Sequence, residues 1–265
     1  MIYKEIAQVI STTKIAENIY KTCLKSPNIA GKVKPGQFIN ILPSFGWNKV
    51  MRRPMSIASQ EGEQISIIYK VIGDGTRLMK QWKLNENVDI IGPLGNYWQG
   101  YDSVTPILIA GGVGIAPILY LHNVLKRIQI NHYLIMGARN NREHFIGHEP
   151  NKNIYLSTDD GSLGIKGNVI DAIDSIDSIN KIKNSKIYAC GPSLMMESIK
   201  RYSLSKQIKC DVALETIMAC GIGICQGCTV EKSISIKLEN SYRKKYVLSC
   251  IDGPIFNVKE IVSCK

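Results

Sequence analysis

The 265-residue chain lacks several features that would assign it to a distinct class of protein. No apolar run approaches the roughly 18 residues that a membrane-spanning helix needs, so no membrane span is expected. The chain has no internal repeat and no low-complexity stretch, and therefore neither a repeat array nor a disordered tract is predicted. The first residues, MIYKEIAQVI, do not resemble a secretory signal. We therefore expect a cytoplasmic protein without disulfides.

Acidic residues are scarce, since 22 Asp and Glu face 33 Lys and Arg and the net charge is +11. Such an excess raises the hypothesis of nucleic-acid binding. The basic residues, however, are scattered along the chain, and no module combines them with aromatic residues as RNA-binding modules do. We therefore predict no nucleic-acid binding and interpret the charge as a solvated surface or a docking face for an acidic partner.

Cysteine, by contrast, occurs in an informative pattern near the C-terminus. Cys220, Cys225 and Cys228 lie in CGIGICQGC, and Cys250 follows in YVLSCIDGP. The spacing C-x4-C-x2-C with a distant fourth cysteine is typical of plant-type 2Fe–2S proteins, in which four thiolates hold two irons. The glycines between the ligands allow the backbone to wrap closely around such a centre. The pattern predicts a 2Fe–2S cluster.

Two alternatives bear on this ligand set. A structural zinc site normally has two C-x2-C pairs, and here only Cys225 and Cys228 form one. For the fourth ligand, Cys210 and Cys264 compete with Cys250, which is favoured because it ends an apolar run after a turn at the expected distance. Free cysteines are often small buried hydrophobes, and the cysteines left over are interpreted in this way: Cys23, Cys190, Cys210 and Cys264.

The pattern of hydrophobic residues divides the chain into three segments. Residues 1–100 contain short apolar runs separated by Gly, Pro and Asn, which predicts an antiparallel barrel interrupted by one helix over 76–82. Residues 101–212 alternate between strand and helix patterns, which predicts an open parallel sheet with crossover helices. Residues 213–265 carry the cysteine loop and are predicted to form a small third domain.

A glycine-rich turn joins the first strand of the second segment to its first helix, in AGGVGIAP. Gly112 and Gly114 would let the backbone approach a pyrophosphate at the helix N-terminus, although such a turn alone is a weak signal. The acidic residue expected about 20 residues further on, to hold a ribose hydroxyl, is absent. Arg139, at the end of the second strand, is consistent with a ribose or 2′-phosphate contact and equally with a solvated position. The choice between NAD and NADP therefore stays open.

The barrel segment contains a second candidate nucleotide site in RRPMS. The guanidinium of Arg53 suits a flavin pyrophosphate, and the Ser56 hydroxyl can donate to or accept from the edge of the ring system. A helix that starts at Gly75 and Thr76 would offer a second phosphate seat. Each feature also has an ordinary explanation, because RRP alone is often an exposed basic turn and Tyr69 alone is often a core or edge aromatic.

Together, RPMS and GT in a barrel and GGVGIAP in a sheet resemble the ferredoxin–NADP reductase superfamily. The segments TDDGSLGIKGNV, YACGP, LETIMACGIGICQGC and CIDGPIF are similar to the electron-transfer subunits of class B dihydroorotate dehydrogenases, and this resemblance covers nearly the whole chain. It implies FAD contacts at Arg53, Pro54, Met55, Ser56, Ile68, Tyr69, Lys70, Gly75 and Thr76. It implies 2Fe–2S ligation by Cys220, Cys225, Cys228 and Cys250, and NAD neighbours at Gly111, Gly112, Gly114, Asp160 and Cys190.

Two departures from the family pattern are mild. The family often has Arg at the position of Lys70 and Ile at that of Met55, and Lys lacks the planar fork of Arg. Cys190 is also consistent with a buried structural thiol. These points loosen individual contacts without changing the assignment.

The resemblance also implies a function. A nicotinamide exchanges a hydride and a 2Fe–2S centre exchanges one electron, so a flavin is expected between them. Electrons would pass from a separate FMN-containing dihydroorotate dehydrogenase catalytic subunit through the cluster and FAD to NAD+, in pyrimidine biosynthesis, within a heterotetramer of two subunits of each kind. Two rival hypotheses are a reductase subunit of another flavin and iron–sulfur NAD(P) oxidoreductase (sulfide dehydrogenase or ferredoxin–NAD(P) type) and a zinc-stabilised binding protein without redox function.

Overall fold

The computed structural model describes residues 1–46, 51–176, 184–233 and 245–264. In chain order, the barrel segment contains β1 (Tyr3–Ala16), β2 (Ile19–Lys25), α1 (Pro27–Ala30), β3 (Phe38–Ile41), β4 (Arg53–Glu61), β5 (Gln64–Lys70), α2 (Asp74–Met79) and β6 (Asn87–Leu94). The sheet segment contains β7 (Thr105–Gly111), η1 (Gly112–Gly114), α3 (Ile115–Arg127), β8 (Tyr133–Ala138), η2 (Asn141–Glu143), η3 (Pro150–Lys152), β9 (Ile154–Thr158), β10 (Ile165–Lys166), α4 (Val169–Ser175), β11 (Ser185–Cys190), α6 (Ser193–Ser205) and β12 (Lys209–Ala213). The last segment contains β13 (Thr229–Glu231), β14 (Tyr246–Leu248) and β15 (Ile255–Asn257).

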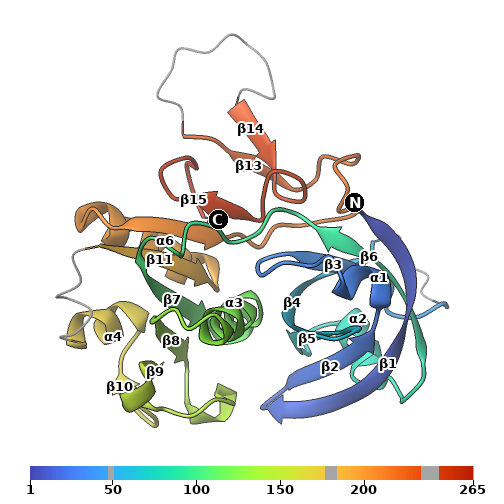
Figure 1. Cartoon of the computed structure of the whole chain (residues 1–265), viewed down its shortest axis with the longest axis horizontal. Helices are drawn as coiled ribbons and strands as arrows, with labels where there is room; N and C mark the ends of the chain where they lie inside the picture. Colours follow the sequence, from blue (N-terminus) through green and yellow to red (C-terminus); the bar gives the residue numbers. More distant parts are fainter. Residues whose placement is uncertain (47–50, 177–183, 234–244, 265) are drawn as a thin grey trace.

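Six strands among the described residues close an antiparallel barrel in the order β1-β2-β5-β4-β3-β6. Alternate residues of β5, namely Ile65, Ile67 and Tyr69, point into the barrel core, as the two-residue period of a strand requires. Ile68, on the outer face of β5, is also buried, because it packs against Ala116 of α3. The helix α3 therefore lies between the barrel and the sheet (Figure 1).

The second part of the structure is a sheet with the strand order β10-β9-β8-β7-β11-β12-β15. Its strands are parallel apart from β15, which runs antiparallel to β12. The central strands β7 and β8 are almost continuously apolar, because helices cover both faces of a parallel sheet. The carboxyl ends of β7, β11 and β12 face the barrel across α3 (Figure 1).

The predictions of an antiparallel barrel and of a parallel sheet with crossover helices are confirmed. The predicted helix over 76–82 is shifted, since α2 begins at Asp74 and ends at Met79. The Thr76 hydroxyl explains this start, because it accepts from the backbone N–H groups of Ile72 and Gly73 and so satisfies free amides near the start of the helix. Met79 is fully buried, whereas Leu78 lies at the surface.

The C-terminal segment touches both larger parts. Its strands β13 and β14 form a small sheet of their own, whereas β15 extends the main sheet beside β12. Its cysteine loop packs on the barrel, where Cys228 and Cys250 share an apolar core with Phe38 and Leu94. The division at residues 100 and 212 stays a prediction. In the part of the chain that the structure describes, no helix is long and apolar enough to cross a membrane.

Candidate functional site

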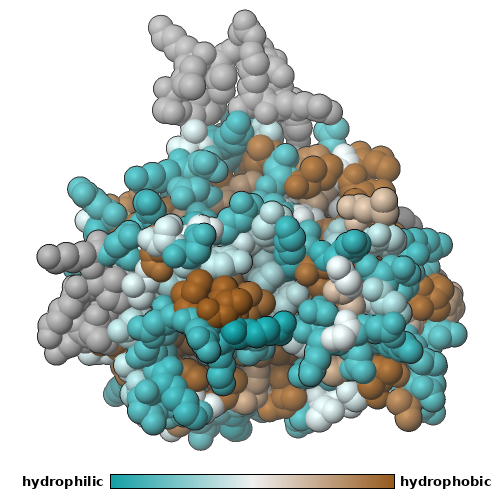
Figure 2. Space-filling view, viewed as in Figure 1, coloured by the Kyte–Doolittle hydropathy of each residue, from teal (hydrophilic) through white to brown (hydrophobic). Residues whose placement is uncertain are grey.

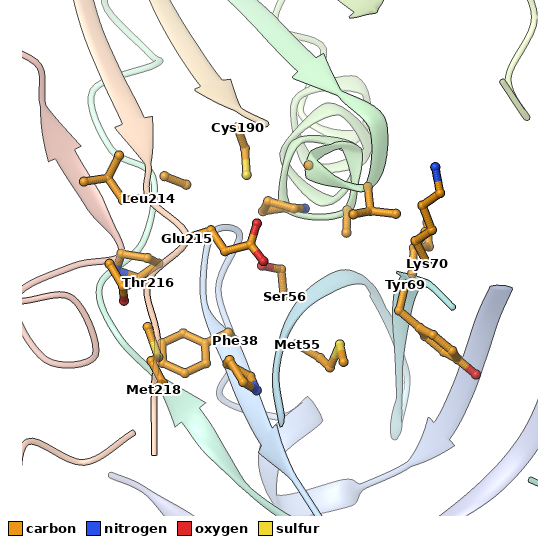
Figure 3. Close-up of a pocket in the computed structure, with 18 of the residues that line it drawn as sticks. Phe38, Met55, Ser56, Tyr69, Lys70, Cys190, Leu214, Glu215, Thr216 and Met218 are labelled. Atoms are coloured by element: carbon orange, nitrogen blue, oxygen red, sulfur yellow. The ribbon is translucent and has the colours of Figure 1, made fainter. Parts of the chain in front are cut away.

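An open pocket lies between the barrel and the carboxyl edge of the sheet (Figure 3). Its empty volume is about 940 Å³, which includes open solvent at its mouth. The sequence-predicted residues that line it from the barrel are Pro54, Met55, Ser56, Ile68, Tyr69, Lys70 and Thr76, and those from the sheet are Gly114 and Cys190. The structure thus brings residues from both predicted nucleotide sites to one cavity.

On the barrel side, β4 and β5 contribute to the pocket in different ways. The Ser56 hydroxyl points into the cavity from β4, whereas Met55, which pairs with Ile39, turns toward the barrel core at the edge of the pocket (Figure 3). Tyr69, on β5, turns its ring into the barrel core, where its hydroxyl lies 3.3 Å from the Thr22 hydroxyl, and burial raises its pKa to about 12. Tyr69 also lines the pocket, and its contact with FAD stays a prediction.

Two predicted phosphate-binding features of the barrel lie together beside the pocket. They are Arg53 and the helix start at Gly75. A Cβ atom added to Gly75 would lie 3.1 Å from Nε of Arg53, so the glycine leaves room for the arginine side chain. The Arg53 Nη1 group donates to the backbone carbonyls of Met51 and Arg52, at 3.0 and 3.2 Å. The Thr76 hydroxyl is occupied by its contacts with its own helix start, and Thr76 also lines the pocket.

On the sheet side, the ends of three neighbouring strands converge. Gly114 follows β7 and packs directly on the end of β11, because an added Cβ would lie 2.4 Å from the carbonyl oxygen of Cys190. The Cys190 sulfur and the Glu215 carboxylate both point into the cavity near Ser56 (Figure 3). Burial, and then the negative charge of Glu215, raise the pKa of the Cys190 thiol to about 12, so this thiol is uncharged at neutral pH.

Several lining residues were missed from the sequence. Leu214, Glu215 and Thr216 directly follow β12, whose carboxyl end lies beside that of β11. The rule that ligands bind at the carboxyl ends of parallel strands, applied to KCDVALET, would have found them. Phe38 and Met218 also line the pocket. No local sequence signal marks these two, because they meet only through the packing of the cysteine loop on the barrel.

Three of the predicted NAD neighbours lie outside the pocket lining. Asp160 follows β9, which is two strands away from β7 in the sheet, and its carboxylate accepts from Ser162 Oγ at 2.6 Å. Gly111 is covered by the side chain of Met195, whose sulfur would lie 2.5 Å from an added Cβ. Gly112 adopts a positive φ of 53° with open space beside it. A contact of these residues with NAD stays a prediction.

A buried carboxylate connects the two sides of the site. Glu143, at the end of η2, accepts from Lys70 Nζ of the barrel at 2.8 Å and from the guanidinium of Arg139, which follows β8. The hydrogen bonds from Arg139 outweigh the cost of burial and, with Lys70, lower the pKa of Glu143 to about 2. Arg139, the candidate ribose or 2′-phosphate contact, is therefore held by a carboxylate that the sequence did not single out.

Replacing Glu143 with glutamine is expected to lower the free energy of unfolding at pH 7 by about 1–3 kcal/mol, because Lys70 and Arg139 lose their shared anion. Folding lowers the pKa of Glu143, so the stabilisation that its charge provides is complete above the ordinary pKa of 4.5. That stabilisation disappears as the pH falls toward 2. Urea unfolding at pH 7 and pH 3 checks this. The difference between wild type and Glu143→Gln should shrink at pH 3. Glu17→Gln, which breaks an exposed pair with Arg142, is the control and should cost less than about 1 kcal/mol.

The four predicted cluster ligands lie together as two pairs. The Cys220 thiol lies beside that of Cys225, and the Cys228 thiol beside that of Cys250. Among the described residues, no three His, Cys, Asp or Glu side chains form a site for a single metal ion. Two thiol pairs match a centre in which each of two irons takes two thiolates, so the donor set fits a 2Fe–2S cluster.

Backbone amides turn toward the first of these sulfurs. Cys220 Sγ accepts from the N–H groups of Ile222 and Cys225, at 3.5 and 3.4 Å. Burial raises the pKa of the Cys220 thiol, but these hydrogen bonds outweigh it and lower the pKa to about 7. Burial raises the pKa of Cys250 to about 12, and ligation to iron would deprotonate it.

The competing candidates for the fourth ligand lie elsewhere. Cys210, on β12, and Cys264 are both buried in the apolar core between the sheet and its helices, with Met196 and Ile199 of α6. Cys250 instead shares its core with Cys228 and Met218. This arrangement favours Cys250 over Cys210 and Cys264 as the fourth cluster ligand.

Comparison with known proteins gives a consistent result. Residues 215–262 match the family model described as the iron-sulfur cluster binding domain of dihydroorotate dehydrogenase B, and residues 108–201 match the oxidoreductase NAD-binding domain. Among solved structures, a chain of an NADH-dependent reduced ferredoxin-NADP oxidoreductase, studied for flavin-based electron bifurcation, has a TM-score of 0.81 at 27% identity. The match covers 97% of this chain and 90% of that one.

Two curated relatives are named dihydroorotate dehydrogenase B (NAD(+)), electron transfer subunit. The protein of Caldanaerobacter subterraneus subsp. tengcongensis is 31% identical, and the match covers 99% of this chain and 100% of that protein. The protein of Fusobacterium nucleatum subsp. nucleatum is 33% identical, with 97% and 98% covered. The chain belongs to the family of dihydroorotate dehydrogenase B (NAD+) electron transfer subunits.

Proposed function

We propose that the chain transfers electrons from an FMN-containing dihydroorotate dehydrogenase catalytic subunit, through a 2Fe–2S cluster at Cys220, Cys225, Cys228 and Cys250 and through FAD, to NAD+. The reaction serves pyrimidine (UMP) biosynthesis in the cytoplasm. One observation carries the proposal: Phe38 and Met218 line the pocket and also pack against Cys228 and Cys250. A single layer of side chains therefore separates the flavin–nicotinamide pocket from the thiols.

The residues of the pocket suit two nucleotides. FAD would place its diphosphate near Arg53 and Gly75 and its ring system between the β4 residues Met55 and Ser56 and the end of β5. The hydroxyl oxygen of Thr216 is buried at the pocket wall without a hydrogen-bond partner in the described structure. An unsatisfied buried hydroxyl is costly unless a ligand pairs with it, so the lining fits a polar ligand.

When bound, FAD supplies the conversion between a hydride and single electrons. The contribution of the chain is then mainly positioning, because hydride transfer needs no general acid or base. Gly114 lets the nicotinamide approach the end of β7. The uncharged thiol of Cys190 lies in the cavity with Ser56 and Glu215 (Figure 3) and would close one side of the reaction site to water.

The catalytic subunit would dock on an apolar surface around the cysteine loop. Ile224 is 76% exposed and Ile217 79%, and Ile222 and Ile251 are also at the surface. Ile222 and Ile251 line a groove with Met1 and Ile2 of the N-terminus. Figure 2 shows apolar residues gathered at the upper right, where Figure 1 places the N-terminus. Exposed apolar surface of this kind marks an interface, and docking there would form the expected heterotetramer of two subunits of each kind.

Replacing Ile224 with lysine is expected to weaken binding of the catalytic subunit by about tenfold or more, because a charge would be buried in the interface. Titration calorimetry or copurification with the FMN subunit measures this, and visible spectra verify that FAD and the cluster are retained. Leu84→Lys is the matched control, because Leu84 is 66% exposed on the barrel outside the groove. Equal binding by both variants would place the interface elsewhere.

The proposed function is tested by coexpressing the tagged chain with the FMN subunit under anaerobic conditions. We expect a complex with one FAD, two irons and two sulfides per copy of this chain, and NAD+ reduction that depends on dihydroorotate. A colourless protein containing zinc would contradict the redox function. A coloured protein that binds no such subunit would favour the rival assignment to another flavin and iron–sulfur oxidoreductase.

A further inference from the structure

A buried amide side chain joins the barrel to the cysteine loop. Asn40, in β3, is 0% exposed. Its Nδ2 group donates to the backbone carbonyl of Cys220 at 3.1 Å. Its Oδ1 atom is buried and has no hydrogen-bond partner within the described residues. In the part of the chain that the structure describes, the Asn40 acceptor is thus unsatisfied, and the hydrogen bond that its side chain donates goes to a predicted cluster ligand.

This arrangement is unfavourable for the stability of the barrel. A buried acceptor without a partner costs about 1–3 kcal/mol, and an apolar side chain of similar shape avoids that cost. Ile39 and Ile41 fill the barrel core from the opposite face of β3. Phe38, which shares the face of Asn40, is apolar and packs against the cysteine loop. An asparagine at position 40 is therefore poorly explained by folding and better explained by the loop that it contacts.

The loop is built to approach Asn40 closely. Gly221 has a φ of +72°, and a Cβ atom there would lie 2.6 Å from Asn40 Nδ2. A residue with a side chain would be strained by the backbone conformation and would push the amide away. The hydrogen bond of Asn40 thus fixes the peptide group that links Cys220 to Gly221.

That peptide group determines where the Cys220 sulfur lies. Cys220 Sγ accepts from the N–H groups of Ile222 and Cys225. Rotation of the peptide group between Cys220 and Gly221 would separate the sulfur from both donors. Hydrogen bonds to the coordinating sulfurs are among the features that set the reduction potential of an iron–sulfur cluster. They stabilise the more negatively charged, reduced state and so raise the potential.

We infer that Asn40 is a positioning residue for the 2Fe–2S centre: it holds Cys220 where two backbone amides reach its sulfur, and it thereby raises the cluster's reduction potential and slows cluster loss. The inference rests on the proposed function, because it requires a cluster at Cys220. Phe38 precedes Asn40 by two residues on the same strand and packs against Cys228 and Cys250, so one strand of the barrel holds both thiol pairs.

The test compares wild type with Asn40→Leu, which removes the donor and the unpaired acceptor together. We expect an unchanged or higher Tm and full FAD content. EPR-monitored redox titration should show a lower reduction potential of the cluster. At a fixed applied potential the ratio of oxidised to reduced cluster should rise about tenfold, which corresponds to 59 mV for one electron. Cluster bleaching by a chelator should be about tenfold faster.

Thr22→Val is the matched control, because it removes a buried hydrogen bond to Tyr69 inside the same barrel. It should lower Tm and leave the cluster's potential and lifetime unchanged. A lower Tm of Asn40→Leu with an unchanged potential would overturn the inference and assign Asn40 a purely structural role. Loss of FAD with an unchanged cluster would also overturn it. Absence of cluster bands in wild type would instead refute the proposed function.

Discussion

Replacing Cys250 with alanine is expected to abolish electron transfer from the catalytic subunit while the chain continues to reduce dyes with NADH. Cys250 is 2% exposed and lies against Cys228. Removing it would leave one iron of the proposed cluster with a single protein thiolate. Changes outside the ligand shell typically cost about 10–100-fold in metal affinity or activity, so the loss of a ligand should cost about 100-fold or more. The visible absorption of the cluster and NAD+ reduction dependent on dihydroorotate measure this.

The structure supplies matched controls for this experiment. Cys210 and Cys264 are as deeply buried as Cys250 but lie in the core of the sheet domain. Cys210→Ala and Cys264→Ala should lose about 1–3 kcal/mol of stability and keep the iron content of wild type. Flavin should stay bound in all three variants, because its predicted contacts come from β4, β5 and α2. If Cys250→Ala keeps its cluster and Cys264→Ala loses it, the assignment of Cys250 as the fourth ligand is wrong.

The sequence sufficed for the features that local pattern determines. Strands such as β5, with Ile65 and Ile67 alternating toward the core, follow from the two-residue period. The cysteine loop follows from ligand spacing, because three of its four thiols lie within nine residues. The glycine-rich turn after β7 was also predictable, since a strand that runs directly into a helix requires a compact backbone.

The remaining features arise from contacts between distant segments. Glu143 pairs with Lys70 only because the sheet packs against the barrel through α3, and no spacing rule joins residues 73 positions apart. Asn40 meets Cys220 across 180 positions. Motifs identified the loops that carry the site, and packing selected the side chains that reach it.

Replacing Gly114 with alanine is expected to impair NAD+ binding severely while FAD and the cluster remain bound. The new Cβ atom would lie 2.4 Å from the carbonyl oxygen of Cys190 and 2.7 Å from Cα of Gly191. Both contacts are with backbone, which cannot rotate away as a flexible side chain does. The turn after β7 must therefore move from the end of β11, at a cost of about 1–3 kcal/mol in overpacking. Because these two strand ends form the predicted nicotinamide side of the pocket, we expect NAD+ affinity to fall by about 10–100-fold.

Calorimetric titration with NAD+ measures the change in affinity, and thermal unfolding measures the loss of stability. Gly31→Ala is the matched control, because Gly31 has right-handed helical geometry and its added Cβ would lie at an ordinary 3.4 Å from Pro27 O. That control should bind NAD+ as wild type does and gain up to about 1 kcal/mol of stability. Wild-type NAD+ affinity in a Gly114→Ala protein of lowered Tm would mean that the displaced turn does not contact the dinucleotide. The nicotinamide would then have to enter over the ends of β11 and β12, where Cys190 and Glu215 already face the cavity.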